Sequence, residues 1–256
     1  MLVLVDVGNT NTVFGVYRGD ELIDSFRLST DRERTADEYG SLLLPLFGRS
    51  GLDPTMAEAV VISSVVPPLH FTLDHLARRY FGKKPLFIEP GVRTGMPIRY
   101  DNPAEVGADR VVNAVAARER FGAPVIVVDF GTATTFDVVN AAGEYAGGII
   151  APGIMISAEA LFAHASRLYR VDVRKPAELI GKNTAGAMQA GIYYGYIGLV
   201  DGILERLLAD MPDTRTVVAT GGQADLIASG SKYIREVDQM LTLAGLKLIY
   251  ERNSRG

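Results

Sequence analysis

The chain has 256 residues, with 26 Lys and Arg against 30 Asp and Glu and a formal net charge of −4. This length allows one large domain or two of ordinary size, and the acidic balance argues against binding of nucleic acid or an anionic membrane through bulk positive charge. The sequence has no cysteine, which excludes disulfides, thiolate metal sites, iron–sulfur clusters and cysteine nucleophiles and leaves carboxylates, hydroxyls, basic side chains and backbone amides for chemistry.

The first half of the chain predicts a strand, a hairpin and then alternating strands and helices. Residues 2–6 are an apolar run that ends in an acid and precedes Gly8, as is typical of a buried strand. Residues 12–17 and 21–28 are rich in β-formers and flank the turn Arg-Gly-Asp, which we interpret as a hairpin turn rather than a cell-adhesion signal. The remaining elements predicted in this half are strands over 59–63 and 85–89 and helices over 35–47, 69–80 and 107–120.

The second half begins in the same way. Residues 124–129 are a second apolar run that ends in an acid, and Gly131 follows it closely. The repeated order of strand, acid, glycine loop and hairpin indicates a weak internal duplication of a whole unit. The boundary is placed near residue 118, which gives predicted domains 1–117 and 118–256. The elements predicted after the second acid are strands over 136–140, 144–150 and 216–219, helices over 157–165 and 184–209, and a helical region within 226–252.

Each repeat places an Asp at the end of a strand and a glycine just beyond it. The glycine allows backbone amides to approach a bound oxyanion closely, and the side chains of Asn9, Thr10 and Thr12 can add donors. Asp6 and Asp129 would repel a phosphate directly, so they make sense if cations stand between carboxylate and phosphate. Two ordinary β-turns would contain the same residues, but two copies at equivalent places favour a phosphate site.

Other nucleotide-binding motifs are missing from the sequence. Residues 181–184, Gly-Lys-Asn-Thr, have Pro176 where a P-loop requires its first glycine, and no G-x-G-x-x-G follows a strand. The Asp-Phe-Gly of residues 129–131 has no H-R-D catalytic loop before it, and there is no G-x-S-x-G nucleophile elbow. These observations exclude nucleotide binding by a P-loop or a Rossmann route.

Six segments, in this order, resemble the motifs of the type III pantothenate kinases, a family of the acetate kinase/sugar kinase/Hsp70/actin superfamily. The resemblance covers nearly the whole chain and implies an α/β fold of two duplicated ribonuclease-H-like domains, as in the actin-like ATPases, with an interdomain cleft and a homodimer. The implied activity is the ATP-dependent phosphorylation of pantothenate to 4′-phosphopantothenate, the first step of coenzyme A biosynthesis. The six segments are LVDVGNTNT (4–12), GADR (107–110), DFGTATT (129–135), GGIIAPG (147–153), GKNT (181–184) and ATGG (219–222).

The resemblance implies two loops for the ATP phosphates. Thr132 lies in the second loop and would donate its hydroxyl to a phosphoryl oxygen, while Asp129 is implied to bind a monovalent cation, K⁺ or NH₄⁺. The sequence alone does not separate that role from a second Mg²⁺ site. Residues 220–222 resemble the segment that faces the adenosine, although a strand-to-helix glycine turn would look the same. The first loop, in which Asp6 is implied to hold Mg²⁺ through water, consists of Asp6, Val7, Gly8, Asn9, Thr10, Asn11, Thr12 and Val13.

Phosphoryl transfer to a hydroxyl requires a nearby carboxylate to accept the proton, which suits Asp109 as the catalytic base. Arg110 brings a cationic fork to an anionic or polar partner, although an ordinary charge pair at a helix start would contain the same residues. Thr184 resembles a contact supplied across the dimer interface, and a helix N-cap would look the same. Tyr100 could also pack on the surface beside Arg99. The residues that the resemblance implies for pantothenate are Tyr100, Gly107, Ala108, Asp109, Arg110 and Thr184.

We expect no targeting segment, because the start of the sequence lacks the pattern of a signal peptide and its most apolar later stretch, 147–163, is shorter than a membrane span. We expect a cytoplasmic protein with ATP and pantothenate as partners and with neither nucleic acid nor membrane. Two alternatives keep the fold: a kinase of another small acceptor, and a catalytically silent nucleotide-binding regulatory protein. The presence of Asp6, Asp109 and Asp129 argues against the silent protein, and no basic stripe supports DNA binding.

Overall fold

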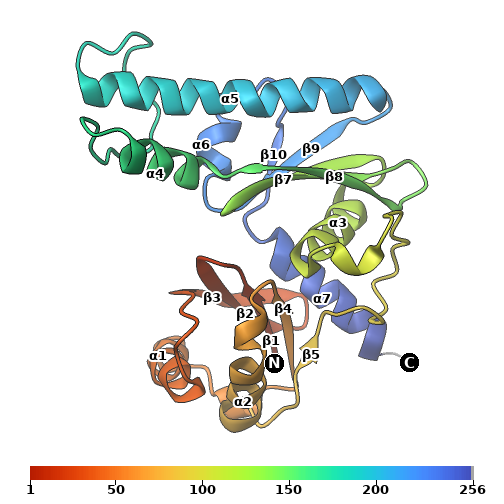
Figure 1. Cartoon of the computed structure of the whole chain (residues 1–256). Helices are drawn as coiled ribbons and strands as arrows, with labels where there is room; N and C mark the ends of the chain where they lie inside the picture. Colours follow the sequence, from red (N-terminus) through yellow and green to blue (C-terminus); the bar gives the residue numbers. More distant parts are fainter. Residues whose placement is uncertain (255–256) are drawn as a thin grey trace. The chain divides into compact units, whose positions relative to one another are not determined.

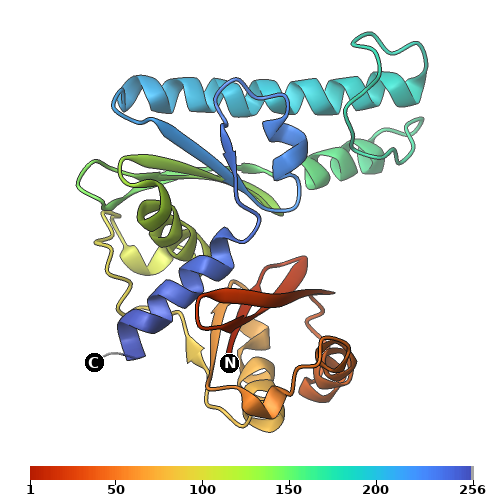
Figure 2. The same ribbon diagram turned by 180° about the vertical axis from the view of Figure 1, so that it is seen from behind.

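The structure, a computed structural model, describes residues 1–254, which divide into two compact units (Figure 1). The first unit comprises Met1–Gly95, Asp101–Ala116 and the described residues from Thr242 onward, and the second comprises Met96–Tyr100 and Ala117–Leu241. Figure 2 shows the same ribbon from behind. The predicted split after residue 117 differs from these units. It assigns the C-terminal helix to the second domain and residues 96–100 to the first, whereas the structure has both the other way round.

The first unit is built on a five-stranded sheet with the order β3-β2-β1-β4-β5. Strand β1 pairs antiparallel with β2 and parallel with β4, and β4 pairs parallel with β5. Parallel neighbours need a crossover connection, and here α1 precedes β4 and α2 joins β4 to β5. The elements of this unit are β1 (Leu2–Val7), β2 (Asn11–Arg18), β3 (Glu21–Ser29), α1 (Ala36–Arg49), β4 (Ala59–Ser64), α2 (His70–Tyr80), β5 (Leu86–Phe87), α3 (Ala108–Phe121) and α7 (Leu241–Ser254), with 3₁₀ turns at Pro54–Met56, Pro67–Leu69 and Pro103–Glu105. The residues of α3 after Ala116 are assigned to the second unit.

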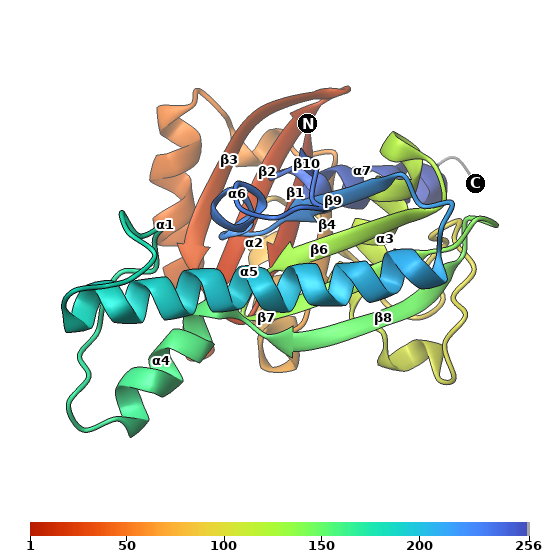
Figure 3. The ribbon, with the colours of Figure 1, turned by 90° about the horizontal axis from the view of Figure 1, so that it is seen from above.

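The second unit repeats this plan with the sheet order β10-β9-β6-β7-β8. Strand β6 pairs antiparallel with β7 and parallel with β9, as β1 does with β2 and β4. The long helix α5 lies over this sheet (Figure 3), and its Tyr196, Val200 and Leu204 pack with the side chains of β6. The elements are β6 (Val125–Phe130), β7 (Ala133–Val139), β8 (Tyr145–Pro152), α4 (Ile154–His164), α5 (Thr184–Asp210), β9 (Thr216–Thr220), α6 (Ala224–Ala228) and β10 (Glu236–Val237).

The duplication predicted from the sequence is confirmed in strand register as well as in strand order. Val7 pairs with Thr12 across β1 and β2, and Phe130 pairs with Thr134 across β6 and β7. Burial follows the same pattern, since both first strands are buried except at the Asp, and both hydroxyls at the start of the second strand are fully buried. The two Asp residues therefore occupy equivalent positions, Asp6 in one unit and Asp129 in the other.

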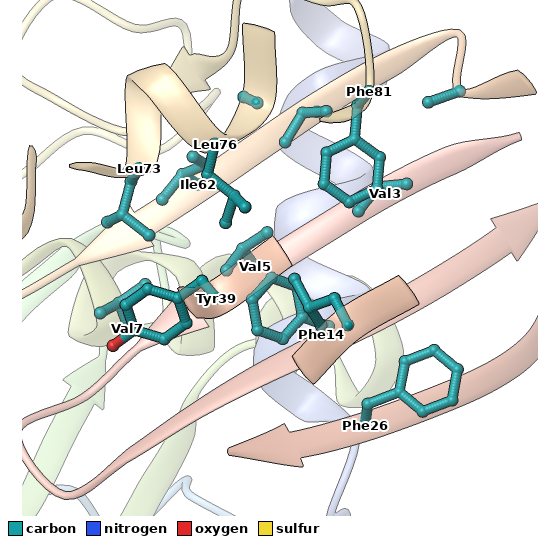
Figure 4. Close-up of a cluster of buried hydrophobic side chains, with 14 of the residues drawn as sticks. Val3, Val5, Val7, Phe14, Phe26, Tyr39, Ile62, Leu73, Leu76 and Phe81 are labelled. Atoms are coloured by element: carbon teal, nitrogen blue, oxygen red, sulfur yellow. The ribbon is translucent and has the colours of Figure 1, made fainter. Parts of the chain in front are cut away.

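The core of the first unit explains why one face of β1 is apolar. Val3, Val5 and Val7 point to one face of the sheet, where helices α1 and α2 cover them (Figure 4). Helix α1 presents Tyr39, Leu43 and Phe47 to this face at spacings of four residues. Its start is fixed by a capping box, in which the side chain of Thr35 accepts the N–H of Glu38 and the Glu38 carboxylate accepts the N–H of Thr35.

The opposite face of the first sheet explains why α7 belongs to this unit. The Leu243 side chain lies against Gly15 of β2, where a methyl group would be only 2.6 Å from it, and Gly245 brings α7 close to the backbone of Val112 in α3. The hydroxyl of Thr242 donates to Asn113 Oδ1 over 2.8 Å. These contacts bury one side of α7 on the sheet that contains β1. Among residues 1–254, no helix combines the length and the apolar character that a bilayer crossing requires.

Candidate active site

The first phosphate loop connects β1 to β2 in a tight turn. The N–H of Gly8 donates to the carbonyl of Asn11 over 3.0 Å, and a methyl group at Gly8 would lie 3.2 Å from that carbonyl oxygen, so the turn leaves little space for a side chain there. Asp6 precedes the turn and is half-buried, whereas Asn9 and Thr10 are exposed at its tip. The loop therefore presents amide and hydroxyl groups to solvent, with one carboxylate at its base.

Thr30, just after β3, fixes this loop from the side. Its hydroxyl donates to the carbonyl of Gly8 over 2.7 Å, and its N–H donates to the carbonyl of Thr10 over 2.9 Å. Because the single Thr30 proton is used on Gly8, the buried hydroxyl of Thr12 is the donor in the 2.9 Å bond between the two threonines. The loop is thus held in one shape before any ligand arrives, which is the preorganisation that anion binding requires.

The second phosphate loop connects β6 to β7 and has the same two backbone bonds in equivalent places. The N–H of Gly131 donates to the carbonyl of Ala133 over 3.0 Å, and the N–H of Gly153 donates to the carbonyl of Thr132 over 3.0 Å. Thr132 is exposed at the tip of the turn. A methyl group at Gly153 would lie 2.2 Å from the Thr132 carbonyl oxygen, so glycine is required where the start of α4 approaches this loop.

Gly153 is also the N-cap of α4, which begins at Ile154, three residues before the predicted start. The first N–H groups of a helix have no intrahelical acceptor and carry the positive end of the helix dipole. No side chain caps this end within the described residues. The second loop therefore lies beside the start of a helix, which favours a bound anion.

Asp129 lies at the base of the second loop, against Gly221 after β9. A methyl group at Gly221 would lie 2.5 Å from Asp129 Oδ1 and 2.7 Å from the carbonyl oxygen of Phe130, and Gly221 has a φ of +91°. The Asp129 carboxylate and the Phe130 carbonyl therefore both lie close to Gly221 at the base of the loop, and oxygen donors of this kind suit a hard cation. The residues present fit the monovalent cation that the resemblance implies at Asp129.

The residues present at Asp6 fit a hydrated Mg²⁺. Mg²⁺ keeps several of its waters and is bound in nucleotide sites by one or two carboxylates together with substrate phosphates. Asp6 supplies one half-buried carboxylate beside the phosphate loop. Within residues 1–254 no cluster of three or more acidic or histidine side chains gathers as a metal site.

Asp109 lies in the first turn of α3, in the first unit. Its carboxylate folds back over Gly107, where a methyl group would lie 2.6 Å from Oδ1, and it accepts the N–H of Arg110 over 2.8 Å. Burial raises the pKa of Asp109, and the bond from the Arg110 N–H together with the Arg110 charge opposes this only in part. Arg110 itself is 7% exposed. Gly107 directly precedes α3, and Ala108, Asp109 and Arg110 form its first turn.

Tyr100 belongs to the second unit, whereas the tetrad belongs to the first. Residues 96–100 lie along the start of β8, because the Arg99 N–H donates to the Tyr145 carbonyl over 2.8 Å and the Tyr145 N–H donates to the Pro97 carbonyl over 2.9 Å. The Tyr100 ring packs against the Tyr145 ring at 6.4 Å. Tyr145 in turn donates its hydroxyl to the fully buried Asp137 over 2.7 Å, so Tyr100 rests on a fixed support.

Thr184 is the first residue of α5 and does not cap it. Asn183 is the N-cap, and its side chain accepts the Gly186 N–H over 2.8 Å. The helix N-cap considered from the sequence is therefore wrong for Thr184, which is exposed. Thr184 lines a cavity of about 780 Å³ between α4 and α5, together with Leu161, Lys182 and Met188.

The sequence did not reveal the roles of Thr30 and Gly153. Thr30 follows β3 and Gly153 follows β8, in each case the third strand of the unit. Each bonds to the loop between the first two strands, so only the pairing of the strands brings the residue to the loop. Gly153 could have been recognised as a close backbone approach from its place at a strand-to-helix turn. Thr30 carries no such local signal.

Solved structures to which the chain is similar show its fold. The activator of the 2-hydroxyisocaproyl-CoA dehydratase from Clostridium difficile, with bound ADPNP, has a TM-score of 0.57 and 12% identity and covers 99% of this chain and 96% of its own. Component A of the (R)-2-hydroxyglutaryl-CoA dehydratase of Acidaminococcus fermentans has a TM-score of 0.58 and 13% identity, and the match covers 100% of this chain and 99% of that one. The fold, with its two duplicated units, is that of the actin-like ATPases and sugar kinases.

The family follows from closer similarities. The family model of the type III pantothenate kinases matches residues 2–206. Proteins with that name from Myxococcus xanthus and Geobacter sulfurreducens are 58% and 57% identical over 253 residues, in both cases with 99% of each chain covered. The chain belongs to the type III pantothenate kinase family.

Proposed function

We propose that this chain transfers the γ-phosphoryl group of ATP to the primary hydroxyl of pantothenate and so forms 4′-phosphopantothenate, which is used for coenzyme A. The observation that carries the proposal is the pair of equivalent loops, each with a strand-end Asp, in a member of this kinase family. A phosphoryl transfer needs positioning and charge neutralisation more than covalent chemistry, and preorganised amides and hydroxyls supply the positioning.

The two loops are proposed to bind the ATP phosphates. The exposed amides and side chains of Asn9 and Thr10 would donate to phosphate oxygens in the first loop, and the Thr132 hydroxyl would donate in the second. Both loops are held by bonds from the chain that follows the third strand, so they lose little entropy when the nucleotide binds. Bound Mg²⁺ at Asp6 and K⁺ or NH₄⁺ at Asp129 would neutralise phosphate charge.

Asp109 is proposed to accept the proton of the pantothenate hydroxyl. Its burial raises its pKa, which makes the carboxylate a stronger base than an exposed Asp. Arg110 follows directly and brings a fixed cationic fork for an anionic or polar group of the substrate. Tyr100, on its support of Tyr145, is proposed as a further pantothenate contact.

We also propose that the chain acts as a homodimer and that Thr184 contacts pantothenate across the dimer interface. Around the cavity that Thr184 lines, large apolar side chains are exposed, which a second copy would cover. These exposed side chains are Met155, Ile156, Leu161, Leu179 and Ile180.

The test is a coupled ADP-release assay with ATP, Mg²⁺ and pantothenate, run with and without K⁺ on the wild type, Asp109→Asn and Asp101→Asn. Loss of a general base typically costs about 10²- to 10⁴-fold in rate. We expect pantothenate-dependent turnover that requires K⁺, a loss of this size in Asp109→Asn, and none in Asp101→Asn, which changes an exposed carboxylate nearby.

The other outcomes of this assay are distinct. Turnover that survives Asp109→Asn keeps the kinase and removes Asp109 as its base. ADP release that responds to another alcohol or to an acyl phosphate acceptor, and not to pantothenate, points to a different substrate. A folded protein that binds ATP but releases no ADP with any acceptor contradicts the proposal and supports a regulatory role.

A further inference from the structure

The chain that follows β3 runs beside the whole first phosphate loop. Thr30 bonds to Gly8, Thr10 and Thr12, as described above, and the next contact is made by Arg32. The Nη2 group of Arg32 donates to Asn9 Oδ1 over 3.2 Å. A guanidinium group is thus held at the tip of the loop that we propose for the ATP phosphates.

The neighbouring charges of this segment have other tasks. Arg34 donates to the carbonyl of Ser29 over 3.1 Å, lies 3.8 Å from Asp31 and packs over the Tyr39 ring at 5.1 Å. Asp31 also accepts the N–H of Glu33 over 3.0 Å. Arg34 and Asp31 therefore fix the segment to α1, while the Arg32 side chain is exposed and extends to Asn9.

The second unit shows what the equivalent place does in the other loop. There the N–H of Gly153 bonds to the carbonyl of Thr132, as the N–H of Thr30 bonds to the carbonyl of Thr10. Helix α4 begins at the next residue and directs its positive end to the second loop. In the first unit no helix begins there; residues 31–34 form a short connection, and α1 begins only at Ala36.

Each loop therefore has a source of positive charge directly after its equivalent backbone bond. In the second unit the source is a helix N-terminus, and in the first it is the Arg32 guanidinium. A guanidinium carries five N–H donors in a planar fork that matches phosphate oxygens. The bond to Asn9 uses one of them and sets the direction of the group.

We infer that Arg32 binds the terminal phosphate of the nucleoside triphosphate at the first phosphate loop. The inference rests on the proposed function, because it requires that this loop binds ATP. It assigns a phosphate contact to a residue that its sequence context, Asp-Arg-Glu-Arg, would place in a solvated charged loop. Its chemistry is charge-assisted hydrogen bonding to phosphate oxygens.

The test is equilibrium binding of the Mg²⁺ complexes of AMP-PNP and of ADP, measured by calorimetry without pantothenate. The variants are Arg32→Ala, Arg32→Lys and the control Arg18→Ala, which removes the same charge from an exposed position at the end of β2. We expect Arg32→Ala to weaken AMP-PNP binding about tenfold or more and ADP binding much less, because the inferred contact is to the terminal phosphate. Arg32→Lys keeps the charge without the planar fork, so its affinity for AMP-PNP should lie between those of the wild type and Arg32→Ala. Arg18→Ala should bind both nucleotides as the wild type does.

The outcomes separate this inference from the proposed function. If the wild type binds AMP-PNP and Arg32→Ala binds it equally well, the Arg32 assignment is wrong and the kinase proposal stands. If Arg32→Ala loses affinity for AMP-PNP and ADP to the same extent, Arg32 only braces Asn9, and the assignment to the terminal phosphate is overturned. A folded wild type that binds neither nucleotide overturns both proposals.

Discussion

The carboxylate of Asp129 and the backbone of Gly221 are in direct contact at the base of the second phosphate loop. A methyl group at Gly221 would lie 2.5 Å from Asp129 Oδ1, closer than a Cβ can approach an oxygen atom. The φ of Gly221, +91°, is also one that residues with a Cβ rarely adopt. The strand-end Asp and the glycine after β9 therefore constrain each other's position, although they are 92 positions apart in the sequence.

Gly221→Ala should therefore lower both the stability of the protein and its affinity for the monovalent cation. The backbone strain costs about 1 to 2 kcal/mol, and the clash with Asp129 adds to it and displaces the carboxylate. We expect a lower denaturation midpoint in urea and a higher K⁺ concentration for half-maximal turnover. Gly122→Ala is the matched control, since Gly122 has a φ of +81° with no neighbour within 4 Å of an added methyl group. Equal effects of the two substitutions would contradict a role for the Asp129 contact.

Asp109→Asn should raise stability at neutral pH while it slows turnover. Burial raises the pKa of the folded carboxyl above its ordinary value of 3.8. Between the two pKa values the folded state binds more protons than the unfolded state, so the contribution of this group to stability falls as the pH rises through that window and stays low above it. Asn cannot ionise and avoids this cost, which is about 1.4 kcal/mol for each pH unit between the two pKa values.

The measurement is urea denaturation of the wild type and Asp109→Asn at several pH values from 4 to 8. The advantage of the variant should be largest at the upper end and should shrink as the pH falls toward the ordinary pKa of Asp. Asp101→Asn, at an exposed carboxylate, is the control substitution. An Asp109→Asn protein that is less stable than the wild type at pH 8 would show that the ionised carboxylate is well stabilised in the fold.

Much of the fold follows from local patterns, and the sites that depend on pairing do not. Two buried strands can be predicted over residues 2–6 and 124–129, because in each case a glycine follows the apolar run closely in the sequence. The helix start at Thr35 is also local, since its capping box involves Glu38 only three residues later. By contrast, the α7 pattern shows an apolar side without showing which of two similar sheets it covers. The contact of Arg32 with Asn9 depends on the register of β2 with β3, which short-range patterns do not fix.

Ser63→Ala should stabilise the protein. Ser63 on β4 is fully buried, and its hydroxyl finds no hydrogen-bond partner within residues 1–254. A buried hydroxyl without a partner costs about 1 to 3 kcal/mol, and Ala removes it with almost no change in shape. Ser64→Ala is the control, because the Ser64 hydroxyl accepts the Val66 N–H over 3.2 Å and its loss should destabilise. The midpoints of urea denaturation should move in opposite directions; a lower midpoint for Ser63→Ala would reveal a partner for its hydroxyl.

Thr30→Val tests whether the first phosphate loop is preorganised. Valine has nearly the shape of threonine but cannot donate to the Gly8 carbonyl or accept from the buried Thr12 hydroxyl. We expect a loss of about 1 to 3 kcal/mol in the free energy of unfolding, since the Thr12 hydroxyl loses its acceptor, and weaker binding of Mg²⁺–AMP-PNP, since the loop must then be ordered by the ligand. Thr55→Val is the control, because the Thr55 hydroxyl donates to Asp53 within one exposed turn of the first unit and makes no contact with the phosphate loop among the described residues. Urea denaturation and calorimetry measure the two effects. If stability falls while nucleotide affinity is unchanged, Thr30 supports the fold alone, and the loop takes its binding shape without it.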